Sequence, residues 1–226
     1  MDLSRMVETI RILLGEPDSD DSHYTDTEIK NTINDVSVNV AAELEENITF
    51  CDYLTVDGTY RYALPADFLK FKMLKLIKDS NHYSLEYKNL IEFEDYAGTM
   101  QTREGTPRIC KVELGRVSVS QVYPGDIWVF PVPDTDNWTL RLYYYQKPST
   151  LTSDGHISEL PELIHLGVCY YAAAILSQKS SEFSKFNDFM SLYRIEIDKA
   201  NSFYAVDQRN RPTVPRDPWG YTRTDA

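Results

Sequence analysis

The spacing of apolar side chains changes twice along this chain of 226 residues, and that change limits its fold more than any single motif. Residues 2–14 and 26–46 carry apolar side chains three and four positions apart, which is the spacing of one helix face. Between about 48 and 147 the period shortens to two, and from Leu160 the helical period returns. The pattern predicts an α+β fold with helices at both ends and β structure between them.

Four helices are predicted, two from each end of the chain. The sequence Thr25-Asp-Thr-Glu28 is a capping box that begins the second of them. The C-terminal pair is predicted near 161–178 and 181–205, and residues 163–176 are apolar on almost every side. Each pair alone would expose its apolar stripe to water. We therefore expect one four-helix bundle, built from the N- and C-terminal helices, with the middle of the chain inserted between them.

The middle of the chain is predicted to be an antiparallel β-sandwich or barrel, because its strands are short and regularly spaced. Asp57-Gly58 is a type I′ turn signal, which would pair Tyr53 with Tyr62 in a first hairpin. A second hairpin, with strands at 73–78 and 83–87, is expected across residues 79–81, followed by a short helix near 90–96. The remaining strands are expected at 109–114, 118–123, 127–130 and 138–146.

These patterns divide the chain into N-terminal bundle helices at 1–47, an inserted β module at 48–147, C-terminal bundle helices at 148–206 and an arm at 207–226. Three prolines in the arm oppose helix formation, so the arm is predicted to be extended. Its aromatic and basic side chains favour docking on a partner chain, with folding back on its own domain and disorder as the alternatives. The candidate partner-binding residues are Arg209, Arg211, Arg216, Trp219 and Tyr221.

The charge of the chain narrows the class of partner. Acidic residues outnumber basic ones 35 to 23, for a formal net charge of −12, and residues 1–60 hold 14 acids and 3 bases. An acidic surface disfavours a non-specific nucleic-acid coat and a polybasic membrane dock. The start has no signal-peptide pattern, and the longest apolar run, 163–176, is shorter than a membrane span. We therefore expect no contact with a membrane.

Motifs for catalysis or cofactor binding are not found in the sequence. It contains no P-loop, no GxGxxG, no HExxH and no GxSxG. His165 has no second ligand three or four residues away, which favours a structural role, and the acidic stretch 16–28 lacks the order of an EF-hand. Trp128 and Trp138 are better explained as core residues than as a sugar-binding platform. We expect no enzyme activity, no catalytic residue, no metal and no cofactor.

Several short segments, taken in order, resemble a known family. They are Tyr24–Ile29 at the start of the second helix; Tyr62–Phe68; Gly105–Arg108, Ile127–Asp134 and Leu140–Pro148 in the β module; and Leu160-Pro-Glu-Leu before an alanine-rich helix, with an aromatic helix near Tyr193. In this order they are similar to segments of the head-to-tail adaptor (connector) proteins of tailed bacteriophages. The resemblance covers about three-quarters of the chain.

The resemblance implies a structural protein in the neck of the virion, made in the host cytoplasm. It implies a ring, commonly of twelve copies, around a DNA passage, with a C-terminal arm that reaches the portal protein and a lower face that receives the tail or nozzle protein. Acidic groups suit a channel in which DNA slides without tight binding. The ring interface would use residues 163–176 and their surroundings. The alternative function is a ligand- or sugar-binding virion module that uses the aromatic β domain.

Overall fold

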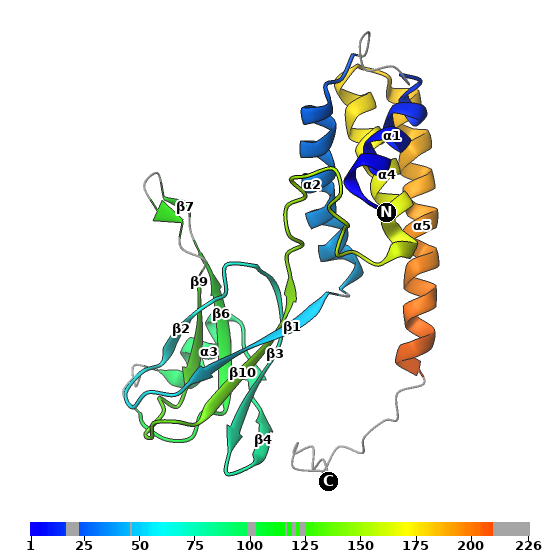
Figure 1. The fold of residues 1–226 in the computed structure, drawn as a ribbon. Coiled ribbons are helices and arrows are strands. Elements are labelled where there is room, and N and C mark those ends of the chain that lie inside the picture. Colours follow the sequence, from blue (N-terminus) through cyan, green and yellow to red (C-terminus); the bar gives the residue numbers. More distant parts are fainter. Residues whose placement is uncertain are drawn as a thin grey trace. The chain divides into compact units, whose positions relative to one another are not determined.

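The computed structural model describes residues 1–16, 23–45, 47–98, 103–115, 117–118, 121–122 and 125–209 (Figure 1). Within these residues the chain is a mixed α+β protein with five α-helices and two four-stranded sheets. It divides into two compact units. The helical unit joins Met1–Asn47 to the helices that follow Lys147, and the β unit is formed by Ile48–Gln146.

The helical unit contains α1 (Leu3–Leu14), α2 (Asp26–Leu44), α4 (His165–Lys179) and α5 (Phe183–Arg209), and a 3-10 turn at Glu162–Ile164 precedes α4. Each end of α1 is capped, because the Asp2 side chain accepts the Arg5 N–H and Gly15 adopts a φ of 81°. The Thr25 side chain accepts the Glu28 N–H at the start of α2, as predicted.

Helix α4 is the centre of the helical unit, where it packs against α1, α2 and α5. Its small side chains allow this close approach: a Cβ atom at Gly167 would lie 3.3 Å from the Cβ of Glu196 on α5. The buried residues of α4 are His165, Gly167, Val168, Cys169, Ala172, Ala173, Ala174, Leu176 and Ser177. Burial on most sides is as predicted. Helices of the same chain cover most of α4, whereas Leu163 and Leu166 stay exposed, and a ring interface through residues 163–176 and their surroundings stays a prediction.

The β unit is built from two sheets. One has the strand order β1 (Ile48–Leu54), β10 (Thr139–Gln146), β3 (Phe68–Lys78) and β4 (Asn81–Ser84); the other has the order β2 (Arg61–Ala63), β9 (Gly125–Phe130), β6 (Ile109–Leu114) and β5 (Glu86–Tyr87). Leu74, Leu140 and Leu142 of the first sheet share a buried cluster with Cys110 and Ile127 of the second. Helix α3 (Leu90–Ala97) packs against the second sheet through Phe93. The core therefore lies between the sheets, with a smaller cluster under α3.

The strand pairing differs from the prediction in three places. The pair β5–β6 is parallel, so the β unit is not wholly antiparallel. Residues 83–87 do not form one strand, since β4 pairs with β3 whereas β5 belongs to the other sheet. Within the expected strand at 118–123, the described residues instead belong to an antiparallel pair, β7 (Val117–Ser118) with β8 (Gln121–Val122).

The hairpin predicted across Asp57-Gly58 is also wrong. Tyr53 lies opposite Leu140 of β10, and Tyr62 lies opposite Ile127 of β9. The residue after β1, Thr55, explains the change: its N–H donates to the Trp138 carbonyl (2.8 Å) and its carbonyl accepts the Asn137 N–H (3.1 Å). These two bonds hold the end of β1 beside the chain that enters β10.

Candidate interaction surfaces

The partner-binding residues predicted from the sequence fall largely beyond the part of the chain that the structure describes. Arg209 is the last residue of α5, so the backbone is helical where the arm was expected to be extended from residue 207. Arg211, Arg216, Trp219 and Tyr221 lie outside the described residues. Partner binding by these five residues stays a prediction.

The buried side chains of His165, Cys110 and Cys169 lie in surroundings that fit a structural role. His165 is buried, one ring nitrogen lies 2.7 Å from the Leu160 carbonyl oxygen, and burial lowers the pKa of the ring. Burial raises the pKa of both the Cys110 and the Cys169 thiols to about 12, so both stay protonated. Within the described ranges no group of three or more metal-ligating side chains occurs, and no helix there is long and apolar enough to cross a membrane.

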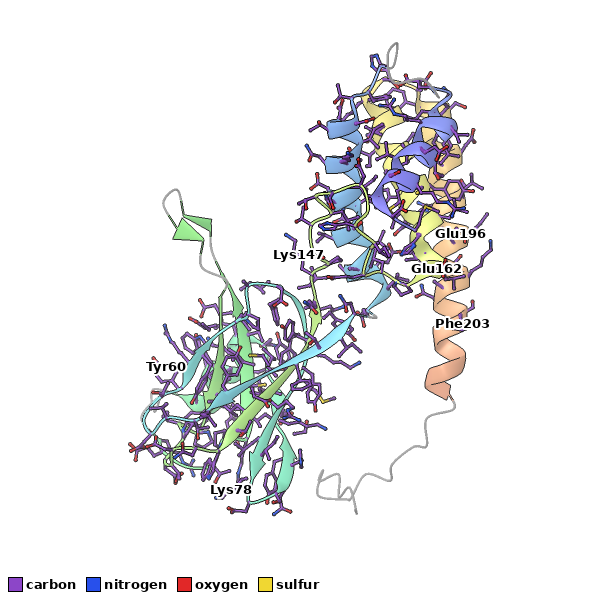
Figure 2. The ribbon with its side chains drawn as sticks, in the orientation of Figure 1. Tyr60, Lys78, Lys147, Glu162, Glu196 and Phe203 are labelled. Carbon is purple, nitrogen blue, oxygen red and sulfur yellow. The ribbon has the colours of Figure 1, made fainter. Side chains whose placement is uncertain are left out.

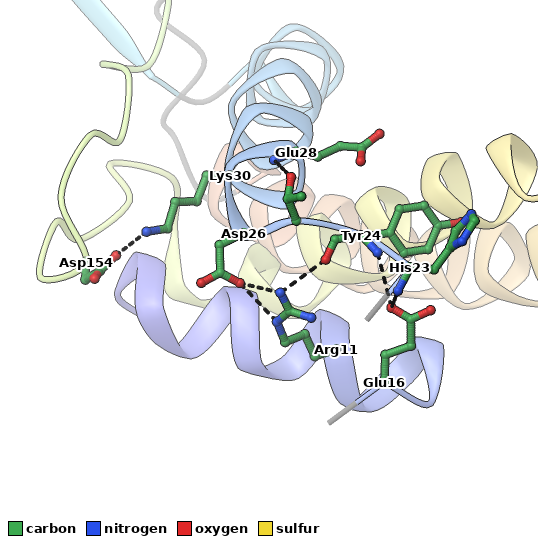
Figure 3. Close-up of polar contacts among 9 residues, drawn as sticks. Arg11, Glu16, His23, Tyr24, Asp26, Glu28, Lys30 and Asp154 are labelled. Atoms are coloured by element: carbon green, nitrogen blue, oxygen red, sulfur yellow. Dashed lines mark hydrogen bonds and ion pairs between the residues drawn. The ribbon is translucent and has the colours of Figure 1, made fainter. Parts of the chain in front are cut away.

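Polar contacts fix the start of α2 against its neighbours (Figure 3). The buried Arg11 side chain of α1 donates to the Asp26 carboxylate and to the Tyr24 carbonyl, the latter at 3.2 Å. The Tyr24 hydroxyl donates to the Leu176 carbonyl of α4 at 2.6 Å. Because these residues come from three elements, the contacts set the position of α1 and α2 on α4.

A second set of contacts orients α5. The Tyr193 hydroxyl donates to the Glu43 carboxylate of α2 at 2.5 Å, and its ring stacks on Tyr171 of α4 with centroids 4.8 Å apart. Burial, with the nearby carboxylate, raises the pKa of Tyr193. The face of α5 that carries Tyr193, Ile197 and Ala200 is therefore buried against α2 and α4.

Another side of α5 leaves large apolar side chains exposed. Ile195 lies three residues after Leu192, and Phe203 lies eight residues after Ile195. These spacings place all three side chains along one side of the helix. Ile195 and Phe203 line a shallow groove together with Asp198, Lys199 and Ser202. Figure 2 marks Phe203 on the part of α5 that continues past the other helices of its unit. We call Leu192, Ile195 and Phe203 the α5 stripe.

The outward face of the first sheet combines cations with aromatic rings. The Cζ atom of Arg141 lies 4.5 Å from the ring centroid of Phe50, and the Nζ atom of Lys75 lies 5.4 Å from that of Tyr143. Nζ of Lys72 lies 5.3 Å from the ring centroid of the neighbouring Tyr145. Cations at these distances are attracted by the ring faces. We call the set Phe50, Lys72, Lys75, Arg141 and Tyr143 the cation–aromatic face.

Asp52 brings a carboxylate to this face. Both of its oxygens accept from the Arg141 guanidinium at 2.7 Å, which is a bidentate pair. These hydrogen bonds hold the pKa of Asp52 below its ordinary value of 3.8. The pair fixes the plane of the guanidinium beside Phe50.

Trp128, a candidate for a sugar-binding platform, is only 8% exposed. Its ring lies between neighbours in the sheet: Nζ of Lys111 is 3.6 Å and Cζ of Arg61 is 3.9 Å from the ring centroid. Tyr60 (Figure 2) approaches the same ring edge-on at 5.6 Å. The ring is part of the cluster under α3, so its faces are not open to stack on a sugar.

The match to a known family now adds to these observations. A family model described as SU10 adaptor protein matches residues 1–217. The chain belongs to this family. It is a family of phage head-tail adaptors, as the resemblance implied. The match extends over both units, so the helices and the β unit of this adaptor belong to one family architecture. A comparison with curated proteins gave no match.

Sequence reasoning missed the α5 stripe and found only part of the cation–aromatic face. The alternation of Tyr143-Tyr144-Tyr145 along one strand indicates an exposed side on which tyrosine is suited to an interface. The α5 stripe could have been found, because Leu192 and Ile195 fall between the buried positions Phe189, Tyr193 and Ile197 of the same helix, and Phe203 follows the buried Ala200. The cation–aromatic face had a weaker signal: β1 alternates exposed and half-buried residues, and β3 contains four lysines. Only the pairing of β1, β10 and β3 brings those cations and rings to one face.

Proposed function

We propose that this adaptor forms a ring in the neck of the virion that joins the portal protein to the tail or nozzle protein. The observation that carries the proposal is the family match over residues 1–217, which covers the helical unit and the β unit alike. A structural role in the head-to-tail junction follows from the family. Portal joining, a ring of twelve copies and a DNA channel are the finer statements that we propose here.

The arrangement of the helices supports a ring of packed subunits. Helices α1, α2 and α5 all contact α4, and we propose that together they act as a four-helix bundle. The α5 stripe leaves apolar side chains exposed on the outside of this unit. Exposed apolar groups gain free energy when a neighbouring chain covers them. Side-by-side packing of the bundles would bury the stripe.

The charge distribution supports a passage for DNA. Residues 1–60 hold 14 acidic and 3 basic residues. Acidic groups along a channel repel the phosphates of DNA, and they release no counterions from it. DNA therefore binds the channel wall weakly and can slide past it. The isolated protein should therefore bind duplex DNA weakly in a mobility-shift titration. Tight binding that falls steeply with salt would contradict this role.

We propose that the C-terminal end of α5 and the chain after it anchor the ring to the portal. Trp219 and Tyr221 would fill apolar pockets, and the arginines at 209, 211 and 216 would pair with carboxylates of the portal. Burying a tryptophan of roughly 200 Å² at about 25 cal/mol per Å² gives an upper figure of about 5 kcal/mol. This gain must exceed the entropy lost when the segment becomes ordered.

The test compares the full chain with a chain truncated after Arg209, which keeps α5 intact, and with a Trp219→Ala/Tyr221→Ala variant. Each is mixed with purified portal, and the assembly is measured by light scattering and negative-stain microscopy. We expect a ring on the portal for the full chain and loss of attachment for both variants, with an unchanged melting temperature. Attachment with unaltered affinity, or unfolding of the truncated chain, would refute the anchor.

A further inference from the structure

We propose that the cation–aromatic face of the β unit binds the acidic helices α1 and α2 of a neighbouring copy in the ring. The inference rests on the proposed function, since it assumes that copies of this chain assemble. It assigns a specific pair of surfaces to the contact between them.

The geometry of the face suits a binding surface. Phe50 is 55% exposed, and its ring lies 6.0 Å from that of Tyr143 on the adjacent strand. Ile48 and Leu54 of β1 are exposed on the same side, because residues two apart along a strand share a face. The two rings hold Arg141 and Lys75 beside them. Holding the cations in place in this way lowers the entropy that they lose on binding.

A protein partner fits this face better than a nucleic acid. Aromatic residues and arginine are enriched at protein interfaces, where an apolar centre is buried and charges give specificity. The exposed side chains of Ile48, Phe50 and Leu54 would gain little from a phosphate backbone. The Asp52 carboxylate, which pairs with Arg141, would repel phosphates. A partner that offers both carboxylates and an apolar surface satisfies every group.

A second copy of this chain offers such a partner. Residues 1–47 contain 12 acidic and 3 basic residues, and Glu8, Asp35 and Ile12 are exposed on α1 and α2. In a ring each copy presents two different surfaces, one to each neighbour, so the two surfaces must be complementary. The acidic helices and the cation–aromatic face are opposite in charge and both carry exposed apolar groups. Their complementarity would also steer the copies together.

The first experiment identifies the contact directly. Unlabelled and ¹⁵N-labelled full-length protein are mixed, assembled with or without portal, and treated with a carbodiimide, which joins ammonium groups to carboxylates in contact. Mass spectrometry of mixed-isotope peptides then reports links between copies. We expect Lys72 or Lys75 of one copy to link to a carboxylate within residues 1–47 of another. Intermolecular links that all involve other residues would overturn the inference.

The second experiment compares Lys75→Glu with Lys185→Glu, a matched charge reversal at an exposed lysine of α5. We expect Lys75→Glu to weaken assembly roughly tenfold or more at physiological ionic strength, and Lys185→Glu to leave it nearly unchanged. Lys75→Met, which keeps the aliphatic stem, should weaken assembly less than Lys75→Glu. Tryptophan fluorescence and melting curves show whether each variant keeps its fold.

The outcomes separate the inference from the proposed function. If the wild-type protein forms no assembly with or without portal, the ring proposal fails and this inference fails with it. If the ring forms and Lys75→Glu assembles like the wild type, the inference alone is overturned. Loss of DNA retardation in Lys75→Glu with unaltered assembly would also overturn it, because the face would then serve nucleic acid.

Discussion

The change Ile33→Asp tests whether the helices from the two ends of the chain stabilise one another. Ile33 lies on α2 with an exposed fraction of 0%, inside a unit whose other helices include α4 and α5. The substitution forfeits about 2–3 kcal/mol of apolar burial and places an unpaired polar group in the core at about 1–3 kcal/mol more. A total of about 3–6 kcal/mol approaches the whole stability of a typical domain, which is about 5–15 kcal/mol.

Two optical probes separate the units in this experiment. Far-ultraviolet circular dichroism follows mainly the helical unit, whereas Trp128 and Trp138 report on the β unit. A Trp219→Phe background removes the third tryptophan. The matched control is Ile12→Asp, the same chemical change at a side chain that is 63% exposed on α1.

We expect Ile33→Asp to lower the urea midpoint of the dichroism transition strongly and to remove the helical signal of α4 and α5 together with that of α2. Ile12→Asp should shift the midpoint little. Tryptophan fluorescence of the β unit should change far less than the dichroism in both variants. Equal midpoints for the two variants, or a loss of signal limited to the length of α2, would refute the reasoning that α2 is needed to bury α4 and α5.

Three further predictions concern charged groups. Asp26→Asn should destabilise the helical unit by about 1–3 kcal/mol, because the substitution leaves the buried Arg11 guanidinium without its carboxylate partner. Arg11→Met should destabilise the unit less. Urea midpoints that reverse this order would contradict the prediction. The pKa of Asp52 is lowered by Arg141, so the stability from this pair is present above pH 3.8 and is lost as pH falls through the lowered pKa. The difference in melting temperature between wild type and Asp52→Asn should therefore shrink in acid, and a constant difference would exclude this origin. Burial lowers the pKa of Lys111, so the β unit should gain stability as pH rises from that lowered pKa toward 10.5. In melts followed by tryptophan fluorescence, the Lys111→Met variant should lose this pH dependence. A variant that keeps the pH dependence would show that another group is responsible.

The sequence by itself determined which elements form. The helical period placed α1, α2 and the start of α5 within about two residues of their bounds, because periodicity reports directly which side of a helix is apolar. The Thr25 cap could also be predicted from the sequence, because a capping box depends on side chains only three residues apart. Burial of α4 was likewise predictable, since a helix that is apolar on every side needs neighbours on every side.

Only the tertiary structure decided which elements meet. The turn signal at Asp57-Gly58 is local, but the partner of β1 is β10, whose residues lie about ninety positions further along the chain. Strand pairing depends on the summed packing of two sheets, which no local window contains. The same contacts placed Trp128 under α3 and brought Arg141 and Lys75 beside exposed rings. Periodicity fixes the face on which a side chain lies, whereas its neighbours on that face depend on energies shared among segments distant in sequence.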